Sequence, residues 1–121
     1  MNSNNIIRDI MADYGLVKGN LSGNRINFPQ NLFGSGVYVM FSEIYETVTK
    51  DGYKVRAVVG KNSYRSLKGD STIYIGFKLY LPTHREHFTC KITDESKHSV
   101  ESAIRKVVSE IAKRCDDYGK E

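Results

Sequence analysis

The chain has 121 residues, with 18 Lys+Arg against 14 Asp+Glu and a formal net charge of +4. This length suits one domain that folds without metals or disulfides, and no stretch approaches the roughly 18 consecutive apolar residues of a membrane-spanning helix. The charge is uneven, because residues 53–92 carry eight bases and two acids. An acidic partner such as nucleic acid is therefore favoured, and a membrane partner is not expected.

The two cysteines, Cys90 and Cys115, lie at positions where the apolar pattern of their segments places core side chains. A free thiol packs there as a small hydrophobe, which indicates a reducing compartment. The first 15 residues lack the basic start and uninterrupted apolar stretch of a secretion signal. The expected location is the cytoplasm.

Residues 1–36 are predicted to form a helix followed by a glycine-rich loop. Apolar side chains recur at helical spacing at Ile6, Ile7, Ile10, Met11 and Tyr14, and Gly15 is suited to end the helix. Four glycines, a proline and several asparagines then indicate a long connection. Its apolar residues Ile26, Phe28, Leu32 and Phe33 need cover, so we expect part of this loop to lie across the core or an exposed sheet face.

Residues 37–93 are predicted to form a four-stranded antiparallel meander. The strongest strand is 72–81, in which Ile73, Ile75, Phe77, Leu79 and Leu81 alternate with polar and aromatic residues. The strand 37–48 changes phase near Ser42, which predicts a bulge, and Asp51-Gly52 predicts a tight turn to the strand 53–59. The fourth strand is expected at 87–93.

Residues 94–115 are predicted to form an amphipathic helix that packs on the apolar sheet face, with residues 116–121 as a frayed tail. Its apolar positions are Val100, Ala103, Ile104, Val107, Val108, Ile111 and Cys115. Thr93, Asp94 and Ser96 are candidate N-caps. The fold class is therefore α+β, a two-layer single domain with the element order α-β-β-β-β-α.

The outward sheet face is the candidate binding site, because aromatic rings can stack bases while cations neutralise phosphates. An uncovered antiparallel sheet also normally shows Lys, Arg and Tyr to water, which is the structural alternative. His87 belongs to this face, and the loop after the second strand is expected to be mobile when free and ordered on the partner. The predicted binding residues are Lys54, Arg56, Lys61, Tyr64, Arg65, Lys68, Tyr74, Lys78, Tyr80 and Lys91.

Catalytic and metal sites receive little support from the sequence. His84, His87, Cys90 and His98 lack the spacing of a zinc site. Asp94, Glu95 and Lys97 have the residue types of a metal-dependent nuclease but sit at a predicted helix start. No serine or cysteine lies in a nucleophile motif. We therefore expect no cofactor, no metal and no enzymatic activity.

The leading hypothesis is a non-enzymatic protein that binds nucleic acid or a nucleic-acid enzyme complex through its basic, tyrosine-bearing face. In composition the chain resembles small accessory proteins of phages and mobile elements, including inhibitors of the anti-CRISPR type, a resemblance that implies such a partner. The alternative is a protein-interaction module that uses Phe28, Leu32 and Phe33 for a partner or a homodimer. A metal-dependent nuclease is the third hypothesis.

Overall fold

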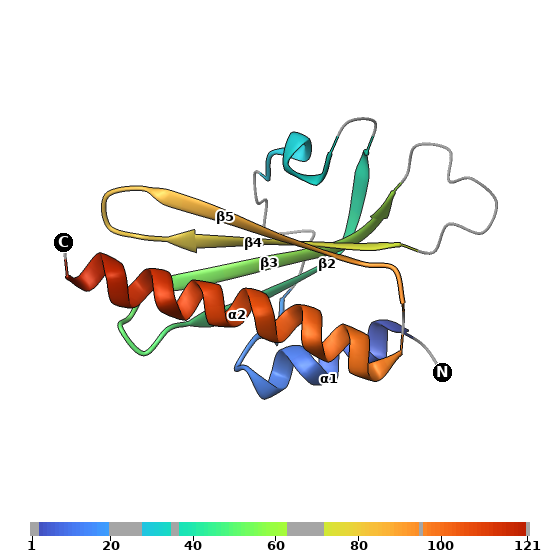
Figure 1. Cartoon of the computed structure of the whole chain (residues 1–121), viewed down its shortest axis with the longest axis horizontal. Coiled ribbons are helices and arrows are strands. Elements are labelled where there is room, and N and C mark those ends of the chain that lie inside the picture. The colour runs from blue at the N-terminus through green and yellow to red at the C-terminus, as the bar shows by residue number, and fades with distance from the viewer. Residues whose placement is uncertain (1–2, 20–27, 35–36, 63–71, 95, 121) are drawn as a thin grey trace.

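The computed structural model describes residues 3–19, 28–34, 37–62, 72–94 and 96–120. Its elements are α1 (Ser3–Asp13), β1 (Val17–Lys18), the 3-10 helix η2 (Gln30–Phe33), β2 (Val39–Val48), β3 (Lys54–Asn62), β4 (Ile73–Tyr80), β5 (Arg85–Ile92) and α2 (Lys97–Gly119). The strands form one antiparallel sheet in the order β1-β2-β3-β4-β5. Both helices cover one face of this sheet, and η2 lies on the other side (Figure 1). The predicted α+β class is confirmed.

The sheet has five strands where four were predicted, because two residues of the expected loop pair with β2. Lys18 lies opposite Tyr45 in this short β1, and its ammonium group is 3.1 Å from the carboxylate of Glu43. Glu43 is buried, and a buried carboxylate needs a charged or hydrogen-bonding partner. The ion pair gives a physical reason for β1. A strand of this kind cannot be predicted from the spacing of apolar residues.

The main core lies between the sheet and the two helices. The predicted inward residues of β4, from Ile73 to Leu79, are fully buried there together with Ile7, Ile10 and Met11 of α1. The buried positions of α2 are Val100, Ile104, Val107, Ile111 and Cys115. Burial raises the pKa of both thiols, that of Cys90 to about 12, so neither thiol is poised for reaction.

The predicted turn and helix cap are present, but the end of α2 differs from the prediction. Gly52 has a φ of 90° between β2 and β3, and the Ser96 hydroxyl accepts a hydrogen bond from the backbone N–H of Ser99. The expected frayed tail is wrong for residues 116–119, which continue the helix. Tyr118 explains the extension, because its ring packs 5.8 Å from that of Tyr53 and its hydroxyl meets Thr83.

The predicted bulge lies in β2, where the register with β3 shifts between Phe41 and Glu43. Gly60 faces it so closely that an added Cβ would stand 2.2 Å from the backbone oxygen of Met40. Gly60→Ala should therefore lower the free energy of unfolding by about 1–3 kcal/mol, measured by urea denaturation. Gly119→Ala is the control, because no atom lies within 4 Å of its added Cβ. Equal stability of both variants would rule out the close approach.

No helix within the described ranges is long and apolar enough to cross a membrane.

Candidate nucleic-acid interface

The sheet face opposite the helices is built by strand register. Cross-strand partners point to the same side of a sheet, and Lys54 pairs with Tyr80 while Arg56 pairs with Lys78. Lys78 in turn pairs with His87, and Tyr74 pairs with Lys91. The predicted grouping of these residues on one face, called here the outer face, is therefore confirmed.

The middle of the outer face is covered, which corrects the expectation of a continuous flat surface. Phe28 packs over Gly76 so tightly that an added Cβ at Gly76 would lie 2.6 Å from the ring. Phe28 also packs with the buried Ile44 and Val58, and with Phe33 and Phe41. The expectation that part of the glycine-rich loop crosses a sheet face is confirmed for this segment.

Two of the predicted binding residues are buried as a result. Tyr74 is 3% exposed and Lys78 is 7% exposed, and the ring of Phe33 meets that of Tyr74 edge-on at 5.5 Å. Tyr74 is thus a packing residue of the aromatic cluster and has no open face for a stacked base. The sequence prediction was wrong in treating Tyr74, Lys78 and Tyr80 as one open platform.

The predicted binding residues on the outer face form two groups, one at each end of that face. Tyr74 and Lys91 lie at one end, where the Lys91 ammonium is 5.9 Å from the Tyr74 ring. Tyr80 lies at the other end, six residues further along β4 or about 20 Å away.

Lys61, another predicted binding residue, is in β3 and pairs with Ile73, so it points to the helix side and not to the outer face. The predicted mobile loop covers residues 61–68, but its first two residues belong to β3. The rest of it, with Tyr64, Arg65 and Lys68, lies outside the described residues.

The end around Tyr80 concentrates positive charge. The centroid of the Tyr80 ring is 5.3 Å from the guanidinium of Arg85, 5.4 Å from the ammonium of Lys78 and 5.8 Å from the guanidinium of Arg56. Lys54 stands opposite Tyr80 on β3 and is exposed. These five residues, Lys54, Arg56, Lys78, Tyr80 and Arg85, are called the Tyr80 patch. Arg85 was missed because the predicted strand began two residues later.

A shallow pocket of about 460 Å³, widely open to solvent, lies beside the patch and is lined by Phe28, Pro29, Lys78, Arg85 and His87. It brings Lys78 into reach of a ligand although little of that side chain is exposed. The T-shaped packing of Phe28 against His87, with 5.2 Å between ring centroids, fixes one wall. An apolar wall beside three basic side chains can receive an anionic ligand that also carries an aromatic or apolar part.

The electrostatics of the patch favour an anion. Burial lowers the pKa of Lys78, and the charges of Arg85 and Arg56 lower it further. Burial also lowers the pKa of His87, with a smaller effect from Lys78. Glu46 is the one acid among the described strand residues of the outer face, and it lies 3.4 Å from Nε of Arg56. A bound phosphate would offset the repulsion from Arg85 and Arg56, which is the second cause of the lowered pKa of Lys78 after burial.

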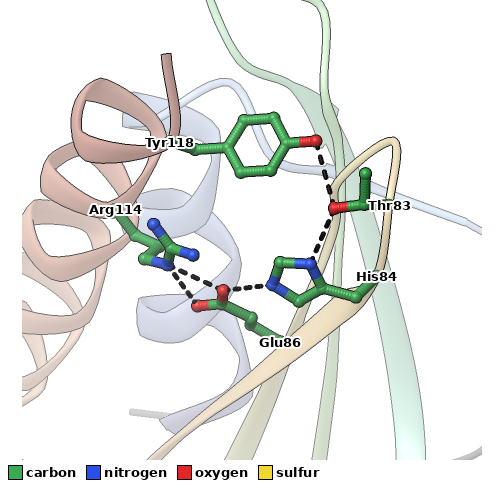
Figure 2. A network of polar contacts seen from close by, with 5 residues as sticks. All are labelled: Thr83, His84, Glu86, Arg114 and Tyr118. Atoms are coloured by element: carbon green, nitrogen blue, oxygen red, sulfur yellow. Dashed lines mark hydrogen bonds and ion pairs between the residues drawn. The ribbon is translucent and has the colours of Figure 1, made fainter. Parts of the chain in front are cut away.

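A second polar constellation joins the β4–β5 hairpin to the end of α2 (Figure 2). The Thr83 hydroxyl is 3.1 Å from that of Tyr118 and 2.9 Å from Nδ1 of His84. Nε2 of His84 is 2.6 Å from Glu86, whose two carboxylate oxygens accept from Nε of Arg114 at 2.8 and 2.7 Å. The Thr83 hydroxyl, the His84 imidazole and the Glu86 carboxylate form a hydrogen-bonded series. Because Tyr118 and Arg114 of α2 bind the two ends of this series, we interpret the network as a structural clip between the hairpin and the helix.

This clip should make stability depend on pH. Burial alone would raise the pKa of Glu86, but hydrogen bonds from His84 and Arg114 outweigh it and lower the pKa. The stabilisation is therefore complete above the unfolded pKa near 4.5 and is lost as the pH falls below it. Glu86→Gln should cost about 1–2 kcal/mol at pH 7 and almost nothing at pH 3, measured by denaturation at both values. An equal cost at pH 7 and pH 3 would contradict the role given to the Glu86 carboxylate. The control is Glu110→Gln, at an exposed position of α2.

The residues of the metal and nuclease hypotheses do not converge in the described part of the chain. His87 points to the outer face, whereas Cys90 pairs with Ile75 and points to the helices. Asp94 accepts hydrogen bonds from the Ser96 backbone and the Ser99 hydroxyl, each at 3.0 Å, and these lower its pKa at the start of α2. Glu95 lies outside the described residues. Within those residues, no group of three or more His, Cys, Asp or Glu side chains is placed to hold a metal ion.

The residues of the protein-interaction alternative have separate environments. Phe28 is 8% exposed and Phe33 is half-buried in the aromatic cluster, so these two side chains offer little surface to a partner. Leu32 alone of the three is exposed, at 44%.

The chain matches no protein-family model, no curated protein and no solved structure.

Proposed function

We propose that this chain is a non-enzymatic binding protein that holds single-stranded nucleic acid at the Tyr80 patch. The observation that supports this proposal is the arrangement of three cationic groups within 5.3 to 5.8 Å of one tyrosine ring. Guanidinium and ammonium groups bind phosphate oxygens. The nearby pocket adds an apolar wall against which a base can rest.

A single strand suits this geometry better than a duplex. Among the described residues, the positive groups of the outer face gather at the Tyr80 end, with Lys91 alone at the other end, and Phe28 and Phe33 cover the middle. Such a compact site contacts a few phosphates and can accept an unpaired base in its pocket, whereas the bases of a duplex are already stacked and paired. The proposal also covers a single strand that is held within a nucleic-acid enzyme complex. An inhibitor of the anti-CRISPR type would have such a complex as its target.

Fluorescence anisotropy with labelled oligothymidylate tests the proposal. Four cations, one of them partly neutralised by Glu46, should give a slope of about −2 to −3 for log K against log salt. Binding at about 50 mM salt that weakens with this slope would support the phosphate contacts. Absence of binding at that salt concentration, or an affinity that does not depend on salt, would contradict the proposal.

Binding should also strengthen as the pH falls, because His87 shares its pocket with Lys78 and Arg85 and has a lowered pKa. His87 is therefore neutral at pH 7.5 and takes up a proton below its ordinary pKa of 6.5, and a bound phosphate favours that protonated form. The affinity for oligothymidylate should therefore rise as the pH falls from 7.5 to 5.5, because each protonated His87 adds a positive charge beside the phosphate. His87→Gln should flatten this profile, and an unchanged profile in that variant would assign the effect to another group.

A further inference from the structure

A cavity of about 340 Å³ lies on the opposite side of the sheet from the Tyr80 patch. Its apolar lining comes from the sheet, the segment after α1 and the C-terminal half of α2, as Leu16, Val55, Phe77, Val108, Ile111 and Ala112. The polar lining residues Lys50 and Asp51 are exposed and mark the side that faces solvent. An apolar pocket that enters a core beside a polar opening is the usual form of a small-molecule site.

The lengths of the two helices explain why this space is open. α1 has 11 residues and α2 has 23, or about 16 Å against 35 Å at 1.5 Å per residue. α1 lies beside the first half of α2, and the second half continues alone above the end of the sheet that carries the β2–β3 hairpin (Figure 1). The cavity is where a longer α1 would have packed.

The chemistry of the cavity favours a neutral ligand. Lys50, at its solvent side, is 3.8 Å from Asp116 and adjoins Asp51, so its positive charge is already compensated and the two acids disfavour an anionic ligand. The Cys115 thiol in the wall stays protonated, because burial, and then the nearby charge of Asp51, raises its pKa. Thr47 adds a hydroxyl to the lining, and Thr49 already accepts a hydrogen bond from the Tyr53 backbone at 3.1 Å.

We propose that this cavity binds a small, neutral, mainly apolar molecule of bicyclic aromatic size with one hydrogen-bonding group for Thr47. The size follows from the volume, since a cavity of about 150 Å³ holds benzene and this one is about twice as large. The site is independent of the proposed nucleic-acid interface. It lies on the helix side of the sheet, so either assignment can fail without the other.

Indole is the probe that fits this description. Titration followed by two-dimensional NMR should give saturable shifts at Val55, Val108 and Ile111, which line the cavity. The expected dissociation constant is about 0.1–1 mM, as suits a ligand of this size. Oligothymidylate should leave these signals unchanged. Indole shifts that do not saturate, or that spread over surfaces away from the cavity, would overturn the proposal.

Two phenylalanine variants on α2 make the test specific. Ala112 lines the cavity and is exposed, so Ala112→Phe can fill the space without replacing a core side chain and should weaken indole binding at least tenfold. Ser102→Phe, at an exposed α2 position outside the cavity lining, should change it less than twofold. Thermal denaturation of both variants confirms folding. Wild-type affinity in a folded Ala112→Phe variant would contradict the assignment, whatever the wild-type NMR shifts show.

Discussion

Replacing Phe28 with alanine should lower the free energy of unfolding by about 3–5 kcal/mol, measured by urea denaturation. Phe28 is 8% exposed and joins Ile44 and Val58 in the smaller core on the outer face. Its ring also meets the rings of Phe33, Phe41 and His87. Truncation removes apolar burial and leaves a cavity above Gly76, which has no side chain to fill it.

Leu32→Ala is the matched control for this prediction. Leu32 belongs to the same segment but is 44% exposed, so its truncation should cost no more than about 0.5–1 kcal/mol. A cost below about 1 kcal/mol for Phe28→Ala would mean that this segment does not pack on the sheet. Tyr74 and Lys78 would then be open to solvent, as the sequence pattern had suggested.

Removing Arg56 and Arg85 together should weaken oligothymidylate binding by about 30-fold to 140-fold at 50 mM salt. Each guanidinium borders the Tyr80 ring, and a charged hydrogen bond to phosphate contributes about 1–1.5 kcal/mol in such a site. Loss of two phosphate contacts should also reduce the salt slope by about 1.4. Anisotropy titrations of the Arg56→Ala, Arg85→Ala double variant at several salt concentrations measure both effects.

The control carries the same loss of charge on the other side of the molecule. Lys106 and Lys113 are exposed on α2, and their double alanine variant should lower affinity less than threefold, because only long-range attraction is lost. Equal weakening in the two double variants would show that net charge alone governs binding. The Tyr80 patch would then have no special role.

The sequence predicted most of the backbone architecture because each main element has a strong periodic pattern. The alternation from Ile73 to Leu79 and the helical spacing from Val100 to Cys115 depend on burial, and both segments are buried as expected. β1 was missed because its two residues depend on the ion pair between Lys18 and Glu43. The last turn of α2 was missed because Tyr118 finds partners on two distant hairpins.

Phe28 covers the middle of the outer face, and the sequence contained two signals for this cover that the prediction did not combine. Ile44 and Val58 fall on the polar side of their strands, and a glycine in the middle of a strand, such as Gly76, often marks close approach by another group. Together they indicate an apolar lid such as Phe28. The hairpin clip had no comparable signal, because Glu86 and Arg114 are 28 residues apart and meet only when α2 packs on β5.

Amide NMR of the labelled protein, titrated with oligothymidylate, can locate the bound strand directly. If the Tyr80 patch is the interface, the largest shifts should fall at residues 54–56, 78–80 and 85–87, with Tyr74, Lys91 and the exposed face of α2 unchanged. The shifts should diminish as salt is added, because phosphate contacts are lost. Shifts centred on Tyr74 and Lys91, or on α2, with residues 78–80 and 85–87 unaffected, would contradict the proposed site.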